Sequence, residues 1–286
     1  MFDKFLYRIL CGFFLGFSVF APGFSGSIVA IIMGVYQDIL RIISNPFKDF
    51  KQNIRFCFPM LLGAAVSAVL FVLALNYMFY SNEKATYLLF VGLISGNLPV
   101  IFAEVKKNRF KRRYLIAGLV AFAAALVLGV FSPRIAPASN ASGFAENWLT
   151  LALGGFAGGV TAPIPGMSVS IILIVMGLYS QLIFVAESLL RLDLTHLVPF
   201  AFFCVFAVAG LVSSSRVIKF AFKKYPGFSN TMVFGFMSGS LLGVLISSLG
   251  KDDPGFSWFL GGAMFIIGLG LSVLFVLLGR FMSKKE

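Results

Sequence analysis

The stretch Ala21-Pro22-Gly23-Phe24-Ser25-Gly26-Ser27, continued by the apolar residues 28–36, organises this chain because it occurs twice. Adding 143, half of the 286 residues, carries Pro22-Gly23 onto Pro165-Gly166, and Ser25 and Ser27 onto Ser168 and Ser170. Further residues keep this offset: Gly12/Gly155, Gly16/Gly159, Gly34/Gly177, Tyr36/Tyr179, Gly92/Gly235 and Gly96/Gly239. Chance similarity between apolar helices would not hold proline, glycine and serine in register. The chain is therefore predicted to consist of two repeats, residues 1–143 and 144–286.

The composition excludes a water-soluble exterior. Hydrophobic residues make up 59% of the chain and charged residues 12%, and the mean hydropathy is +0.96. The apolar runs have the length of helices, and strands of about ten alternating residues are missing from the sequence. The predicted fold class is therefore an all-α polytopic membrane protein. The net charge of +12 lies mostly in short loops, which indicates a topology signal and no nucleic-acid partner.

Each repeat is predicted to hold one broken or re-entrant helical hairpin and three transmembrane helices. In the first repeat the hairpin covers residues 5–43 and the spans cover 57–78, 85–104 and 114–131. In the second repeat the hairpin covers residues 148–186 and the spans cover 197–215, 231–249 and 256–279. The Pro-Gly pairs break the hairpins, because proline removes a backbone donor and glycine adopts unusual dihedral angles.

Charge predicts how these segments cross the bilayer. The basic clusters near residues 4–8, 41–55, 106–113, 216–224 and 280–285 hold 19 of the 23 Lys and Arg residues and should be cytoplasmic, together with both termini. Each hairpin must then return to the side that it entered, so the two repeats have opposite orientations. Two full spans would satisfy this, but a first arm of about 16 residues ending in Pro-Gly favours a re-entrant hairpin. The two tips would meet near the bilayer centre.

The two hairpin tips form the predicted substrate-binding site. A helix that starts after a Pro-Gly break offers free backbone N–H groups, a positive dipole end and a capping serine, which together favour an anion. The residues of this site are Pro22, Gly23, Ser25, Gly26, Ser27, Pro165, Gly166, Ser168 and Ser170. The alternative is that these small residues only allow close helix packing. Both interpretations stay open for the glycines along the arms, such as Gly12 and Gly155.

Polar residues elsewhere in the apolar segments are weaker candidates. Ser95, Asn97, Ser238 and Ser240 fall near the centres of their spans and are candidates for lining the same cavity. Asp38, Glu104 and Glu187 are candidates for carrying a coupling proton, although an acid near a helix end usually meets water. The sequence predicts no catalytic residue, no metal site and no cofactor.

At the doubled motif the chain resembles the polyprenyl-phosphate (undecaprenyl-phosphate) translocase family of the PopT type, formerly a membrane family of unknown function. The resemblance rests on residues 21–27 with Met33-Gly34-Val35-Tyr36, and on residues 165–170 with Met176-Gly177-Leu178-Tyr179. In the family pattern a glutamate follows each tyrosine, whereas this chain has Gln37 and Ser180.

The resemblance implies a flippase of the bacterial cytoplasmic (inner) membrane. It would carry the phosphate head of the lipid carrier from the outer to the cytoplasmic leaflet while the prenyl tail stays in lipid, which recycles the carrier for cell-envelope synthesis. The implied partners are polyprenyl phosphate and bilayer lipids, and the oligomeric state stays open, a dimer included. The alternative is a secondary transporter of a small soluble anion, which would have a closed pore. A lipid-phosphate phosphatase is disfavoured, because the sequence has one His and no clustered acids.

Overall fold

The computed structural model describes residues 2–21, 26, 29–30, 33–44, 48–107, 112, 114–131, 147–164, 167–250 and 256–283. Within these ranges the chain is helical and contains no strand, so the all-α prediction is confirmed. The helices of the first half are α1 (Phe2–Phe20), α3 (Tyr36–Ser44), α4 (Phe50–Ser81), α5 (Glu83–Lys107) and α6 (Tyr114–Phe131). Those of the second half are α8 (Trp148–Thr161), α9 (Val169–Val175), α10 (Tyr179–Leu190), η1 (Leu194–His196), α11 (Leu197–Lys224), α12 (Pro226–Leu249) and α13 (Trp258–Ser283).

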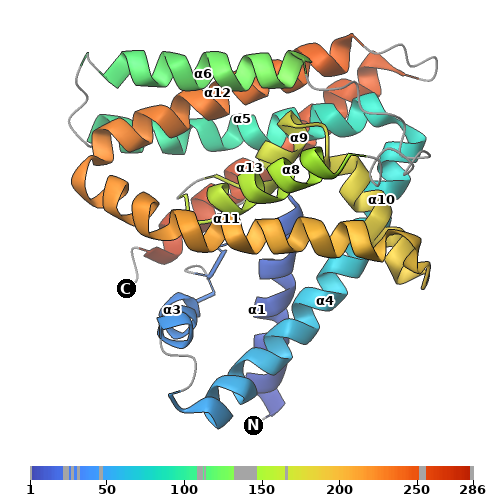
Figure 1. Ribbon diagram of the computed structural model, residues 1–286, viewed down its shortest axis with the longest axis vertical. Coiled ribbons are helices and arrows are strands. Elements are labelled where there is room, and N and C mark those ends of the chain that lie inside the picture. The colour runs from blue at the N-terminus through green and yellow to red at the C-terminus, as the bar shows by residue number, and fades with distance from the viewer. Residues whose placement is uncertain are drawn as a thin grey trace.

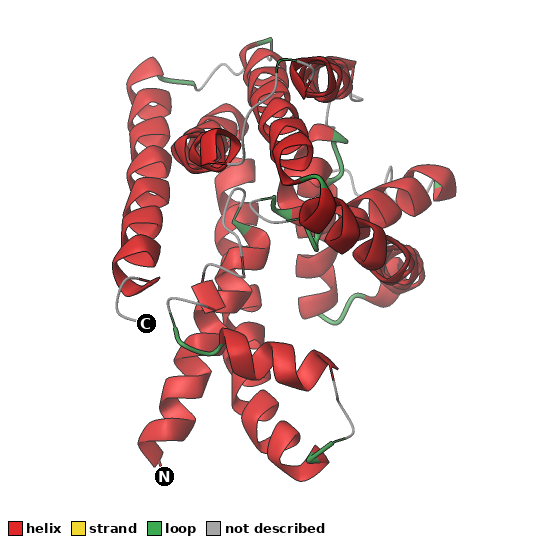
Figure 2. Cartoon of the chain, turned by 90° about the vertical axis from the view of Figure 1, so that its left-hand side faces the viewer, coloured by secondary structure: helices red, strands yellow, loops and turns green. Residues whose placement is uncertain are grey.

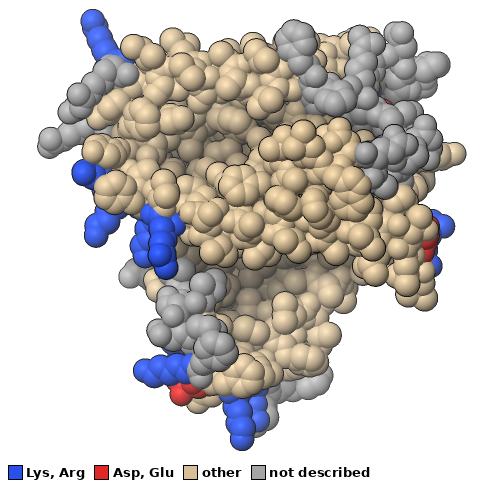
Figure 3. All heavy atoms as spheres, viewed as in Figure 1, with Lys and Arg blue, Asp and Glu red and all other residues tan. Residues whose placement is uncertain are grey.

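Among the described residues, five helices are long and apolar enough to cross a membrane, and a sixth is added if α9 and α10 count as one bent span. Their outer faces are apolar; on α11, for example, Val198, Val205 and Val212 are exposed. The visible face carries Lys and Arg at its margins and a broad uncharged region between them (Figure 3). The protein is therefore a multi-pass membrane protein.

The helices pack in pairs that are related by the offset of 143 residues. In the first half α1 runs beside α4, and in the second half α8 runs beside α11 (Figure 1). The remaining spans pair across the halves, α5 with α13 and α12 with α6, and α5 also contacts α12. The α1–α4 pair stands at a steep angle to the group formed by α5, α6 and α12 (Figures 1 and 2). The contacts at one set of positions therefore recur at positions 143 residues later, and the two repeats stay a prediction.

Glycines allow the close approach within the α1–α4 and α8–α11 pairs. A methyl group at Gly12 would overlap the Met60 carbonyl, and one at Gly155 would overlap the Phe203 carbonyl. Adding 143 to the first pair of residues gives the second. Without a hydrophobic driving force in lipid, helices associate through such tight backbone packing. For these two glycines, close packing is therefore the role that the structure supports.

The second arm of each hairpin is divided, because the Met-Gly sequence turns the chain. In the second repeat α9 ends at Val175, α10 begins at Tyr179, and the two helices are bent by 112°. Gly177 has a φ of 73° and Gly34, its counterpart, has a φ of 61°. Only glycine adopts these angles without strain, so the repeated Met-Gly-x-Tyr sequence is a turn signal.

The hairpin helices of the second repeat are too short to cross a bilayer. At about 1.5 Å per residue, the 14 residues of α8 span roughly 21 Å and the 7 residues of α9 roughly 10 Å. The hydrocarbon core is about 30 Å thick. In the first repeat α1 has 19 residues, more than the predicted arm of about 16. The re-entrant form of the two hairpins stays a prediction.

Candidate functional site

The second hairpin tip holds most of the described part of the predicted anion site. α8 ends at Thr161, whose hydroxyl donates to the Gly158 carbonyl at 2.8 Å. The chain then turns, with the Ile164 N–H donating to the Thr161 carbonyl at 3.0 Å and the Met167 N–H to the Ile164 carbonyl at 3.2 Å. Pro165 and Gly166 lie outside the described residues.

Two serine hydroxyls meet at this tip. Ser168 is 5% exposed and Ser170 is 1% exposed, and the Ser168 hydroxyl donates to that of Ser170 at 3.2 Å. Ser168 has the extended backbone of an N-cap residue, yet its side chain makes no capping hydrogen bond to α9. The capping role expected for this serine is therefore wrong. Its hydroxyl is instead paired with a second hydroxyl, and together they form a small polar group inside an apolar protein.

The first tip is described only at its borders. Ala21 is fully buried, and its N–H donates to the Phe17 carbonyl at 3.0 Å. A Cβ at Gly26 would lie 3.3 Å from the Ser18 hydroxyl, so the chain after the tip returns beside α1. Pro22, Gly23, Ser25 and Ser27 lie outside the described residues. Ser18 donates to the Leu15 carbonyl at 2.6 Å, the counterpart of the Thr161 contact in the second tip.

The borders of both tips belong to the protein interior. Ala21 lies in the same buried cluster as Ile172 and Leu173 of α9. On the other side of the second tip, Met167 packs in a cluster with Ile94 of α5 and Met237 of α12. Met167, which directly precedes the serine pair, thus packs against the two spans that were predicted to line the site.

The serines of those spans bond within their own helices. Ser95 donates to the Val91 carbonyl at 2.6 Å and Ser238 to the Phe234 carbonyl at 2.8 Å, each within its own helix. Ser240 does the same with the Met237 carbonyl at 2.9 Å.

Asn97 reaches out of its helix, but away from the tip. It donates to the Ser272 hydroxyl of α13 at 2.8 Å and to the Leu93 carbonyl at 3.1 Å. It therefore ties α5 to α13, and the apolar side chains of α5 and α12 make the contacts with the tip.

The three candidate acids have different surroundings. Asp38 pairs with Arg41 at 3.4 Å and Glu104 with Lys107 at 3.8 Å, and both carboxylates are about half exposed (46% and 47%). Exposed pairs of this kind are common on helix ends and contribute little. Neither acid lies beside the described part of the tips. Within the described ranges, no three His, Cys, Asp or Glu side chains come together as a metal site.

Glu187 is the buried member of the three, with a side chain that is 9% exposed. Its Oε1 accepts from the Arg191 guanidinium at 2.7 and 3.1 Å, and its Oε2 accepts from the Asn76 amide of α4. Sequence reasoning did not pair Asn76 with Glu187, because 111 residues separate them and α10 must first bend onto α4. This is the most enclosed carboxylate among the three, and it links a hairpin to a span.

Comparison with known proteins places the chain among membrane transporters. The profile of the VCA0040-like family, described as undecaprenyl phosphate translocase-like, matches residues 15–250. A polyprenyl-phosphate transporter of Staphylococcus aureus (strain NCTC 8325 / PS 47) is 26% identical over 290 residues, which cover 98% of each chain. A polyprenyl-phosphate transporter of Vibrio cholerae serotype O1 is 24% identical over 254 residues, covering 83% of this chain and 77% of the relative. No solved structure matches.

Proposed function

The chain belongs to the undecaprenyl phosphate translocase-like family, and we propose that it moves the phosphate head of a polyprenyl phosphate across the bacterial cytoplasmic membrane. The proposed direction is from the outer to the cytoplasmic leaflet, which returns the lipid carrier for another round of cell-envelope synthesis. The observation that carries the proposal is the buried pair of hydroxyls, Ser168 and Ser170, at a helix break between α5 and α12.

An uncharged polar site suits this cargo. A phosphate group is costly inside the hydrocarbon core, so a transporter must replace part of its hydration shell there. Serine hydroxyls and backbone N–H groups donate hydrogen bonds to phosphate oxygens without adding a fixed positive charge. Such a site lowers the barrier and still releases the head, whereas a cluster of arginines would hold it.

Two oppositely inserted hairpins would give access to the site from both sides. The short α8 and α9 in the second repeat, and the burial of Ala21 against α9, support tips that converge inside the protein. The proposed site combines Ser168 and Ser170 with Gly26, and with Pro22, Gly23, Ser25, Ser27, Pro165 and Gly166 around them. Rocking of one half against the other would then expose the site alternately.

Glu187 is the proposed coupling residue. It is buried and shared between Arg191 of the same hairpin and Asn76 of α4, whereas Asp38 and Glu104 are exposed. Protonation of Glu187 would weaken its bond to Arg191 and loosen the contact between hairpin and span. This connects a proton to the position of a hairpin arm.

A transport assay in liposomes tests the proposed function. Purified protein should move labelled polyprenyl phosphate between leaflets, and the variant Ser168→Ala/Ser170→Ala should transport at least about tenfold more slowly, because two donors to the phosphate are lost. Ser248→Ala is the matched control, because Ser248 is equally buried but bonds within its own helix. Full transport by the double variant would contradict the site. Release of inorganic phosphate would indicate a phosphatase instead of a transporter.

A further inference from the structure

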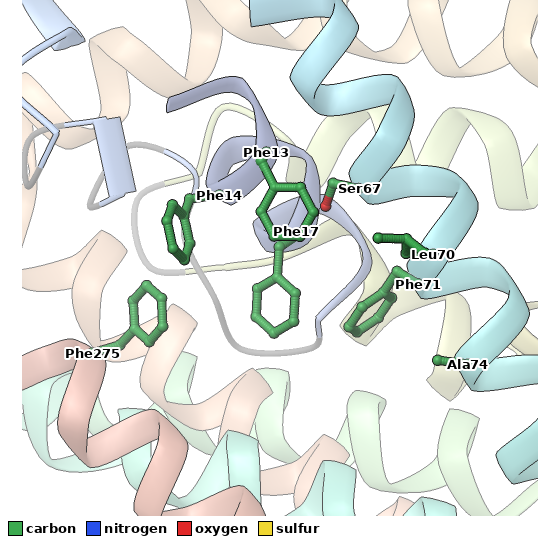
Figure 4. Close-up of a pocket in the computed structure, with 8 residues that line it drawn as sticks. All are labelled: Phe13, Phe14, Phe17, Ser67, Leu70, Phe71, Ala74 and Phe275. Atoms are coloured by element: carbon green, nitrogen blue, oxygen red, sulfur yellow. The ribbon is translucent and has the colours of Figure 1, made fainter. Parts of the chain in front are cut away.

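An aromatic cavity of about 330 Å³ lies between α1, α4 and α13. Four phenylalanines line it, Phe13, Phe14 and Phe17 from α1 and Phe71 from α4, and Phe275 of α13 adds a fifth (Figure 4). The Phe17 ring stands edge-on to Phe71, with centroids 4.8 Å apart, and is stacked with Phe275 at 6.5 Å. The cavity therefore joins a hairpin arm and a span of the first half to a span of the second half.

The cavity opens toward the lipid-facing surface. Phe14 and Leu70 on its wall are 38% and 55% exposed, and Ala74 is exposed as well. A transporter of a soluble anion needs no sideways opening between its hairpin and the neighbouring span. A transporter whose cargo keeps a long tail in the bilayer does need one.

One polar group in the wall lacks a partner. Ser67 of α4 is 2% exposed and lines the cavity, and its hydroxyl makes no hydrogen bond to any residue that the structure describes. Other serines in membrane helices of this chain, such as Ser95 and Ser213, donate to a carbonyl four residues earlier. Buried hydroxyls without a partner are rare, and the Ser67 hydroxyl is free to interact with a ligand in the cavity.

The wall of the cavity packs against the same buried cluster as Ala21, the last described residue before the first hairpin tip. Phe17, Phe71 and Phe275 line the cavity and contact this cluster. Phe17 precedes Pro22 by five residues, and Phe13 lies about one helical turn further back along α1. The cavity therefore begins next to the tip along α1 and extends away from it.

We propose that this cavity binds the first two isoprene units of the polyprenyl chain while the phosphate occupies the tips, an inference that rests on the proposed function. An apolar cavity of about 150 Å³ accommodates benzene, so about 330 Å³ gives room for roughly two five-carbon units. Aromatic faces and edges pack well against the branched methyl groups and double bonds of an isoprenoid. The double bonds also offer π-electrons to the Ser67 hydroxyl, which a saturated acyl chain does not.

Competition binding in nanodiscs tests the assignment. Three phosphates compete with labelled polyprenyl phosphate: dimethylallyl phosphate with one isoprene unit, neryl phosphate with two, and linear decyl phosphate. The wild-type protein should bind neryl phosphate about tenfold more tightly than either of the others; the gain is modest because packing replaces lipid contacts, not water. Ala74→Trp, which fills the exposed end of the cavity, should abolish that preference. Val217→Trp, at the equivalent exposed position of α11, should keep it.

A second measurement does not depend on a variant. A photoreactive group on the second isoprene unit should label α1 and α4 in the wild-type protein. Labelling of α8 and α11, equal binding of decyl and neryl phosphate, or an unchanged preference in Ala74→Trp would overturn the inference. If the wild-type protein still transports polyprenyl phosphate in that case, only the tail site is wrong. If it neither binds nor transports polyprenyl phosphate, the proposed function fails and the tail site with it.

Discussion

In both the α1–α4 pair and the α8–α11 pair, glycines let the two helix backbones touch. We call this line of contact the glycine seam, and the two pairs differ in the residues beside it. Gly12 meets Met60 in one pair and Gly155 meets Phe203 in the other, at positions 143 residues apart. Beside the first seam lie Phe13, Phe14, Phe17, Phe71 and the aromatic cavity. The counterparts of these residues in the second pair are Phe156, Ala157, Val160 and Ser214.

The difference between the two helix pairs separates residues that hold the helices together from residues that could serve a function in one pair only. The backbone contact is kept in both pairs, since a methyl group on either glycine would overlap a carbonyl. Of the four phenylalanines that line the cavity from α1 and α4, only Phe13 has an aromatic counterpart in the second pair, Phe156. The two helix pairs thus have the same packing, and the proposed tail site lies in the first of them only.

The largest expected effect comes from breaking the shared seam. Gly12→Leu and Gly155→Leu should each destabilise the protein by about 3 kcal/mol or more, because the side chain meets a backbone carbonyl that cannot move aside. Thermal unfolding in detergent, followed by size-exclusion chromatography, measures this loss. Gly262→Leu is the control, because a Cβ there meets open space. If one seam tolerated leucine and the other did not, the two pairs would not be equivalent scaffolds.

The next effect comes from exchanging the side chains that differ. Phe17→Val gives α1 the residue of its counterpart Val160, and it should slow transport of polyprenyl phosphate about tenfold by removing the ring between Phe71 and Phe275. Val160→Phe makes the reverse change and should leave the transport rate as it is. Equal effects of the two variants on transport would show that the aromatic lining is not specialised.

A smaller effect is expected at the contact between α10 and α4, which has no equivalent acid in the first repeat, where Ser44 stands in place of Glu187. Glu187→Gln should lower the free energy of unfolding by about 1–2 kcal/mol, because a buried charge-assisted bond to Arg191 is lost. Glu104→Gln should cost no more than about 0.5 kcal/mol, since its pair with Lys107 is exposed. Chemical denaturation of both variants provides the comparison. Equal losses would mean that Glu187 is an ordinary surface acid.

The smallest effect concerns how the two long helices begin. Asp193 caps the short helix η1 that leads into α11. It accepts from the Thr195 N–H at 3.0 Å and from the Thr195 hydroxyl at 2.5 Å, whereas Asp49 before α4 makes no side-chain cap. These bonds lower the pKa of Asp193 below its usual value. The stabilisation is therefore present above the pKa of the unfolded chain and is lost as the pH falls through the lower folded pKa.

Thermal melting as a function of pH checks this expectation. Asp193→Asn should be slightly less stable than the wild-type protein near neutral pH, and the difference should shrink below about pH 4. If the difference in melting temperature between the wild-type protein and Asp193→Asn did not change with pH, the charge of the Asp193 carboxylate would not contribute to the cap.

The spans were predictable from the sequence because their apolar runs match the bilayer thickness. The predicted span 231–249 lies within α12. The predicted span 114–131 coincides with α6, but this helix is shorter than the five described helices that could cross a membrane. The ends were harder to predict: α11 continues to Lys224, beyond the predicted 215, since a basic segment can stay helical once it leaves the apolar region. The bend at Gly177 had a signal, the Met-Gly pair before Tyr179, but a single sequence does not show whether such a glycine turns the chain or permits packing.

The candidate site was predictable only where a local motif carried it. The serines of the second tip were found from the doubled Pro-Gly sequence, and the structure buries both. Two further features depend on which helices become neighbours: the bond between Asn76 and Glu187, and the aromatic cavity. The hydrophobic periodicity of a sequence does not show which helices pack together. Ser168 was expected to cap α9, but its hydroxyl donates to that of Ser170 instead. The spacing of residues in the sequence does not show which of these bonds forms.

The central claim is that the two hairpin tips converge inside the membrane, and the distance between them tests it most directly. After replacement of Cys11, Cys57 and Cys204, spin labels on Ser25→Cys and Ser168→Cys would report that distance in liposomes by electron–electron resonance. Converging re-entrant tips predict a separation below about half of the ~30 Å hydrocarbon thickness. A separation close to the full ~30 Å would place the tips at opposite membrane faces and contradict a shared phosphate site.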